Sequence, residues 1–141
     1  MTARLLTVAL LAALAVACGD DAAPTQPSST TSTATTVTYT GTIDVGGSRF
    51  YSFSNAAAGS VTAFLASVTS PATRLPVAAP LEIGIGVPAG TGCSTTTTQI
   101  VAPGLVSQMS VSLASGVFCL RVADAGELRG PVAFAVRFSH P

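Results

Sequence analysis

The pattern of apolar and polar positions divides the chain into three parts. Residues 5–16 form an almost continuous run of apolar and small side chains. Residues 18–36 are polar and rich in Ser, Thr and Pro, with no apolar period. From Val37 onward apolar residues alternate with polar ones, which is typical of β-strands that bury one face. We therefore expect a signal helix at 1–17, a disordered linker at 18–36 and one folded domain at 37–141.

The alternating pattern predicts about eight short strands, separated by turn signals rich in Gly and Pro. The expected strands are 37–43, 49–54, 61–68, 81–87, 94–101, 107–113, 117–122 and 132–138. Short strands at regular spacing are typical of an all-β, antiparallel two-sheet β-sandwich or jelly roll. Their uniform length favours a sandwich, with a barrel as the alternative.

The strand at 81–87 has the clearest pattern of alternation. Its aliphatic side chains, which we expect to face the core, are Leu81, Ile83, Ile85 and Val87. The opposite face carries Gly84 and Gly86, so a neighbouring backbone or a ligand can lie flat against it. Close packing is the favoured interpretation. Phe50 and Phe53, in the strand 49–54, are also predicted to lie in the core.

The N-terminal apolar run is too short for a membrane span, because a spanning helix needs about twenty residues. Its length is typical of a secretory signal. Cys18 follows the small residues Ala15 and Ala17, which resembles the bacterial lipobox, although that motif prefers leucine at the position of Ala15. We predict that Cys18 carries lipid and anchors the chain stably to a membrane. The alternative is an ordinary secreted protein cleaved near Ala17.

The residue after Cys18 bears on which membrane would hold the anchor. In lipoproteins of Gram-negative bacteria, an aspartate at this position favours retention in the inner membrane. Gly19 stands there in this chain, which favours the outer membrane. We therefore expect a protein of the bacterial cell envelope, lipid-anchored on the non-cytoplasmic side of a membrane.

The charge balance excludes some partners. Without residues 1–17, five arginines stand against four aspartates and two glutamates, with no lysine, so the net charge is −1. Nucleic-acid binding needs a basic face, and we therefore expect no nucleic-acid partner. The same balance argues against electrostatic attachment to anionic lipid.

Cys93 and Cys119 are the two cysteines that remain beside Cys18. In an oxidising compartment an even pair is expected to form a disulfide, which would stabilise the fold by roughly 3.5 kcal/mol in the chain-entropy treatment. A redox pair usually has the Cys-x-x-Cys spacing, which is absent. A zinc site needs four ligands, and His140 is the single histidine.

Candidate catalytic residues are few, and we predict that the protein is not an enzyme and uses no cofactor. His140 is the penultimate residue, at a chain end where we expect fraying, and no nucleophile-elbow pattern is present. Asp124 and Glu127 fall in one loop and are weak candidates for a Ca²⁺ site. The favoured interpretation is an aspartate that binds its own turn beside a solvated glutamate.

The segments 40–53, 58–62 and 113–124 carry glycine, aromatic, strand and aspartate patterns that resemble the bacterial pre-peptidase C-terminal domain family. The resemblance extends from Thr40 to Pro141. It implies a jelly-roll β-sandwich that acts as a non-catalytic accessory or binding module. Some relatives bind calcium or collagen, but no matching acidic cluster occurs here, so neither property is carried over.

These observations together predict a lipid-anchored envelope protein whose sandwich serves as a protein-interaction or accessory module for an unidentified envelope partner. The alternative is a glycan, small-molecule or Ca²⁺ binding module that uses a loop end or the face with Gly84 and Gly86. Exposed aromatic residues would support glycan binding, but Trp is absent, and Tyr39 and Tyr51 both fall in strands. A minimal hydrolase would have to use His140.

Overall fold

The computed structural model describes residues 33–141. The predicted signal segment 1–17, the lipidation site Cys18 and most of the predicted linker lie outside the described residues. The strands are β1 (Thr35–Ile43), β2 (Ser48–Asn55), β3 (Gly59–Thr69), β4 (Leu81–Ala89), β5 (Gly92–Val101), β6 (Met109–Leu113), β7 (Gly116–Asp124) and β8 (Val132–His140). No helix long and apolar enough to cross a membrane occurs among residues 33–141.

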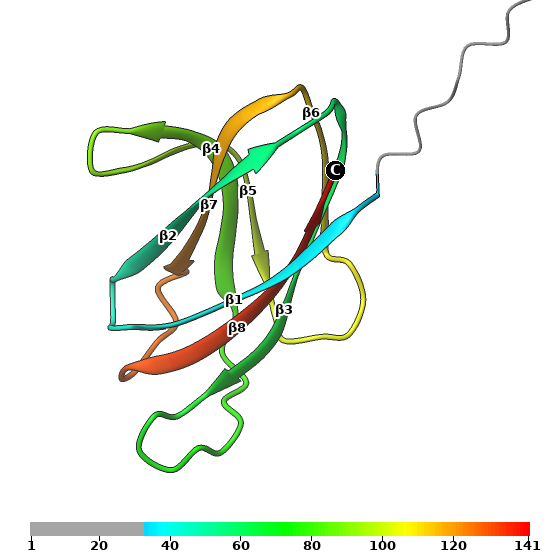
Figure 1. Ribbon diagram of the computed structural model, residues 1–141. Coiled ribbons are helices and arrows are strands. Elements are labelled where there is room, and N and C mark those ends of the chain that lie inside the picture. The colour runs from blue at the N-terminus through cyan, green and yellow to red at the C-terminus, as the bar shows by residue number, and fades with distance from the viewer. Residues whose placement is uncertain (1–32) are drawn as a thin grey trace, which may run out of the picture. The chain divides into compact units, whose positions relative to one another are not determined.

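The strands form two four-stranded sheets that pack face to face (Figure 1). One sheet has the order β1-β8-β3-β6 and the other has the order β2-β7-β4-β5. All strand pairs are antiparallel. The chain passes repeatedly from one sheet to the other, which is the connectivity of a jelly roll. The predicted all-β sandwich of about eight strands is confirmed.

The core lies between the two sheets. Leu81, Ile83 and Ile85 are fully buried, as the alternation predicted. Val87 is 46% exposed, so its predicted place in the core is wrong. The reason is that β4 pairs with β7 only as far as Gly86 and then continues into a hairpin with β5 alone.

The two phenylalanines of β2 differ in burial. Phe53 is buried, as predicted, whereas Phe50 is 43% exposed and its predicted burial is wrong. Successive side chains of a strand point to opposite faces, so Tyr51 and Phe53 share the inner face and Phe50 lies on the outer face. Because β2 carries aromatic residues on both faces, apolar character alone does not show which face points to the core.

Each strand differs from its predicted range by one or two residues at one or both ends, and the differences at the two ends of the domain matter most. β1 begins at Thr35, two residues before the predicted start at Val37. At the other end of the chain, β8 continues to His140, which pairs with Thr35. The expectation that the chain frays at His140 is therefore wrong, because the longer β1 supplies a partner for the last residues of β8.

Candidate functional site

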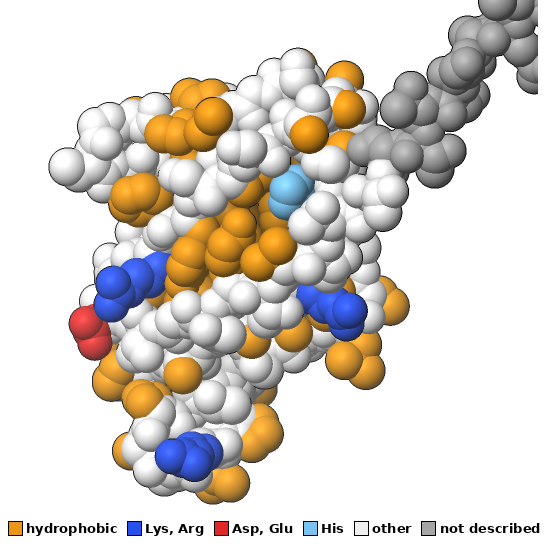
Figure 2. All heavy atoms as spheres, viewed as in Figure 1, with side chains coloured by type: hydrophobic (Ala, Val, Ile, Leu, Met, Phe, Trp, Pro, Cys, Tyr) orange, Lys and Arg blue, Asp and Glu red, His pale blue; other side chains and the backbone are white. Residues whose placement is uncertain are grey.

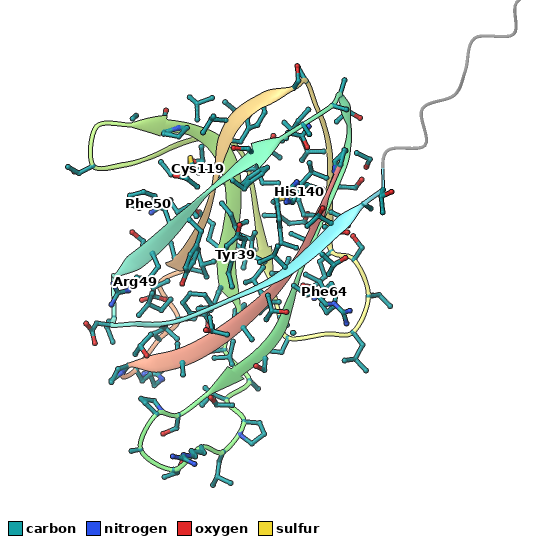
Figure 3. All side chains as sticks on the ribbon, viewed as in Figure 1. Tyr39, Arg49, Phe50, Phe64, Cys119 and His140 are labelled. Atoms are coloured by element: carbon teal, nitrogen blue, oxygen red, sulfur yellow. A yellow bond between two sulfur atoms is a disulfide. The ribbon has the colours of Figure 1, made fainter. Side chains whose placement is uncertain are left out.

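Aromatic side chains fill the space between the sheets on the side where β1 faces β2. This aromatic seam comprises Tyr39, Tyr51, Phe53, Phe138 and His140. The rings of Tyr39 and Tyr51 stack with centroids 4.7 Å apart, and those of Phe53 and Phe138 meet edge to face at 4.5 Å. Figure 2 shows an apolar area on this side, bordered by His140, and Figure 3 labels Tyr39 and His140 along it. The seam joins the two sheets directly.

Side chains of β2 also cover the backbone edge of β1. The Tyr51 hydroxyl donates to the Thr40 carbonyl oxygen at 2.8 Å, and Arg49 Nε donates to the Thr42 carbonyl oxygen at 3.1 Å. Gly41 lies between these carbonyls, and a Cβ there would come within 2.6 Å of the Tyr51 hydroxyl oxygen. Two carbonyls of the edge strand β1 thus accept hydrogen bonds from side chains of β2.

The two tyrosines of the seam are protonated at neutral pH, and burial shifts their pKa further in that direction. It raises the pKa of Tyr39 and of Tyr51 above 10.0, although the nearby Arg49 guanidinium partly lowers the pKa of Tyr51. Both phenols are therefore neutral hydrogen-bond donors at neutral pH, and neither is suited to act as a base.

His140 belongs to the seam rather than to a catalytic arrangement. Its ring centroid lies 5.4 Å from that of Phe53 and 5.6 Å from that of Phe138. Its Nδ1 lies 3.0 Å from the Pro141 carbonyl oxygen. Within residues 33–141, no hydrogen bond joins this imidazole to a side-chain hydroxyl or a side-chain carboxylate, so the geometry of a Ser-His-Asp triad is not assembled there.

Asp124 binds backbone amides of two loops. One carboxylate oxygen accepts the N–H of Gly46 at 2.8 Å, and the other accepts those of Gly126, Glu127 and Leu128. These bonds, that from Gly46 first, hold the pKa of Asp124 below its ordinary value of 3.8. Asp124 therefore binds its own turn, as predicted. It also fastens the β7–β8 loop to the β1–β2 turn, which the sequence analysis did not predict.

The weak candidate site for calcium is not built as a cluster. Glu127 is exposed, and its backbone N–H, rather than its carboxylate, contacts Asp124. In the part of the chain that the structure describes, no three or more His, Cys, Asp or Glu side chains gather as metal ligands would.

The predicted disulfide is present between Cys93 of β5 and Cys119 of β7, with an S–S distance of 2.02 Å and a Cα separation of 5.8 Å. The disulfide spans β4, which pairs with β5 on one side and with β7 on the other. A Cβ on Gly86 would overlap the Ser94 carbonyl oxygen, and one on Gly84 would lie 2.6 Å from the Thr95 methyl group. The flat glycine face therefore receives β5 of the same chain, as the packing interpretation predicted.

The β5–β6 loop carries the most exposed large apolar side chains. Leu105 is 88% exposed and Val106 is 73% exposed. The loop is nevertheless held firmly: Gln108 Oε1 accepts the N–H of Leu65 at 2.8 Å, and Gln108 Nε2 donates to the Ala102 carbonyl oxygen. The sequence analysis missed this loop, although two adjacent aliphatic residues in a turn region were a visible signal.

An apolar groove of about 470 Å³ lies beside the same loop. β3 contributes Ala66–Thr69, the β3–β4 loop contributes Pro76–Ala78, and the β5–β6 loop contributes Ala102 and Pro103. The main-chain N–H of Gly104 donates to the Leu65 carbonyl oxygen at 2.8 Å, which ties the loop to β3. The groove thus borders the loop that carries the two exposed aliphatic residues, although neither of them lines it.

A second cavity of about 470 Å³ lies where the β3–β4 and β7–β8 loops meet. Its polar lining comes from Ser70, Glu127 and Arg129. Arg74, in the β3–β4 loop, is exposed and has a positive φ of 59°. The structure does not bring Arg74 into either cavity.

A scan of the chain against protein-family models finds no match, and a search of curated proteins finds none. The likeness to the pre-peptidase C-terminal domain family therefore remains a prediction from the sequence.

Proposed function

We propose that this chain is a lipid-anchored protein of the bacterial cell envelope, with a non-catalytic sandwich that binds another envelope protein. The apolar run that ends at Cys18 supports the anchor. The engagement of His140 in the aromatic seam supports a non-catalytic role, since this ring packs against Phe53 and Phe138. The proposal needs no cofactor.

The observation that carries the proposal is the exposed but hydrogen-bonded β5–β6 loop. Leu105 and Val106 face solvent, although burial would stabilise them, and two side-chain hydrogen bonds of Gln108 fasten the loop. Exposed apolar surface of this kind marks interaction sites. A loop that is already ordered loses less conformational entropy on binding. The neighbouring apolar groove offers a place for a side chain of the partner.

The test is crosslinking in intact cells of the native organism, followed by capture of the tagged full chain and mass spectrometry. We expect a defined envelope protein with the wild-type chain and its loss with the double substitution Leu105→Ser and Val106→Ser. Val117→Ser is the matched control, because Val117 is 59% exposed on β7, away from the loop. Cys18→Ala tests the anchor.

Recovery of the same proteins from wild type and from the double variant would contradict the role of the loop. Recovery that is unchanged by Cys18→Ala would contradict the anchor. The two halves of the proposal are thus tested separately.

The aromatic seam favours a second candidate, a glycan-binding module. Tyr39 and Tyr51 are half-buried and stacked, so part of their surface remains accessible at the side of the sandwich. A thermal-shift screen of glycans, with Ca²⁺ as a separate arm, tests this candidate. A ligand at a hundred times its Kd should add about 2.7 kcal/mol to the free energy of unfolding. No shift over the panel would contradict it.

A further inference from the structure

β5 is an edge strand in which consecutive residues, rather than alternate ones, are exposed. Side chains of a strand alternate between two faces, so a strand that covers a core alternates between buried and exposed residues. From Thr96 to Ile100 every residue of β5 is exposed. The opposite edge strand, β6, has only five residues, so it leaves the inner face of β5 uncovered at Thr97 and Gln99.

The outer backbone edge of β5 is also free. β5 pairs with β4 alone, and none of the hydrogen bonds within residues 33–141 reaches its other edge. The bulge in the β4–β5 ladder lies at Thr96, and from Thr97 to Val101 the register is regular. This regular segment presents alternating N–H and C=O groups to solvent.

The other three edges differ from β5. Tyr51 and Arg49 cap carbonyls of β1. β2 carries the charge of Arg49, and charged residues on an edge disfavour pairing with another strand. β6 is short, which also limits pairing. β5 is therefore the edge that lacks these protective features.

We propose that β5 pairs, antiparallel, with β5 of a second copy of this chain, so that the β2-β7-β4-β5 sheets of the two copies join edge to edge. A two-fold axis across this regular segment would pair each copy's free N–H groups with the other's carbonyls. Such an isologous contact closes on itself as a dimer.

The chemistry of the segment fits a second copy. There is no charged residue between Glu82 and Arg121 in the sequence, so two copies of β5 meet without repulsion between like charges. Glu82 and Arg121 themselves form an ion pair at 2.8 Å on the same sheet. The segment contains Thr97 and Thr98, and threonine pairs across strands stabilise antiparallel ladders.

This inference deepens the proposed function by naming a partner of the module. The inference rests on the proposed function in one respect: a lipid anchor would concentrate copies of the chain at one membrane. Its test measures self-association, which is read out separately from capture of another envelope protein.

The first test introduces one cysteine into the full chain, produced in a bacterial host so that it crosses into an oxidising compartment. Thr97→Cys, Thr98→Cys and Gln99→Cys sample the register around the two-fold axis. Thr38→Cys is the matched control, since Thr38 is exposed on the other Thr-rich edge, β1. Peptide mapping verifies that Cys93 and Cys119 remain paired.

We expect a reducible band at twice the chain's mass for at least one β5 variant and a band at least fivefold weaker for Thr38→Cys. Equal crosslinking at β5 and Thr38, or no crosslinking from any β5 variant, would overturn the proposal.

The second test uses charge and does not depend on disulfide chemistry. Gln99→Glu and Gln99→Lys are exposed substitutions and should leave the fold intact, as a thermal melt would verify. With two differently tagged copies in one cell, each variant alone should recover severalfold less of its counterpart than wild type does. Glu and Lys variants expressed together should recover near wild-type amounts, because opposite charges then face each other. Unchanged recovery with single variants, or no restoration in the mixture, would overturn the proposal.

Discussion

The two lateral sides of the sandwich are closed to different extents. On the side of β1 and β2, stacked rings join the sheets, and Tyr51 and Arg49 cap the edge of β1. On the side of β5 and β6, a long strand lies opposite a short one, and Thr96–Ile100 are exposed. On the side of β1 and β2, which we call the sealed side, side chains of the same chain cover the strand edge. The side of β5 and β6, which we call the open side, presents a free strand edge and an apolar loop.

The difference does not come from the composition of the edge strands. β1 and β5 are both rich in threonine and carry no charge, so neither has the lysine or proline that commonly protects an edge. What differs is the strand opposite each of them. β2 supplies an arginine and a tyrosine to the edge of β1, whereas β6 ends before it can cover β5. Protection of an edge strand in this fold therefore depends on the strand that packs opposite it and not on its own sequence.

The largest expected effect is on the sealed side. Phe138→Ala removes the ring that meets Phe53, Tyr39 and His140 and should lower the free energy of unfolding by about 3–5 kcal/mol. Thr97→Ala on the open side should change it by less than about 0.5 kcal/mol, as exposed substitutions do. Chemical denaturation measures both, and similar losses would contradict the contrast between the sides.

Removal of the disulfide should have the next largest effect. The double substitution Cys93→Ala and Cys119→Ala releases a loop with a sequence separation of 26, which should cost roughly 3.5 kcal/mol in the chain-entropy treatment. The start of β5 should also lift from β4, so the amides around Ser94 should exchange faster with solvent. Unchanged exchange at these amides would contradict the role of the disulfide in holding the hairpin.

The cap on β1 should have a smaller effect. Tyr51→Phe removes the hydrogen bond to the Thr40 carbonyl and should cost about 1 kcal/mol, measured by thermal denaturation. Tyr39→Phe is the matched control, because among the described residues the Tyr39 hydroxyl makes no hydrogen bond within the chain. Equal losses from both substitutions would show that the cap contributes nothing beyond the packing of the rings.

Asp124 should make the sealed side sensitive to acid. Backbone hydrogen bonds, first that from Gly46, hold its pKa in the folded state below 3.8. A carboxylate with a depressed pKa stabilises the fold above its unfolded pKa, and this stabilisation is lost as the pH falls through the folded pKa. The free energy of unfolding should therefore decrease as the pH is lowered below about 4, and less steeply for Asp124→Asn. Glu127→Gln should retain the wild-type pH profile, whereas a wild-type profile for Asp124→Asn would contradict this.

The exposed loop should contribute least to stability. Leu105 is 88% exposed, so Leu105→Ser should change the free energy of unfolding by less than about 0.5 kcal/mol. In contrast, Gln108→Ala removes both side-chain bonds that hold the loop and should cost about 1–2 kcal/mol. A larger loss from Leu105→Ser than from Gln108→Ala would contradict the view of a firmly held loop with a solvent-facing tip.

The number of strands, their approximate positions and the disulfide could all be predicted from the sequence. The period of two located β4 and placed Ile83 and Ile85 in the core, because alternation depends only on local backbone geometry. It failed at Val87 and Phe50, where burial depends on how far the neighbouring strand extends and on which of two apolar faces points inward.

The open side could not be predicted in the same way. Alternation does not reveal the order of strands in a sheet, so it does not identify β5 as an edge or show that β6 is too short to cover it. His140 was misjudged for the same reason, since its partner Thr35 is distant in the sequence. Leu105 and Val106 lie between two strands, where no alternation of apolar and polar residues indicates which side chains are exposed.

The measurement that tests the central contrast most directly is amide hydrogen exchange of the full chain, followed by mass spectrometry over a range of protein concentrations. If β5 accepts a second copy, protection of the amides in Thr97–Ile100 should increase with concentration, while that of the edge amides at Thr36 and Thr38 should stay constant. Protection of β5 that is the same at every concentration, or a concentration dependence that appears at β1 instead, would contradict the account.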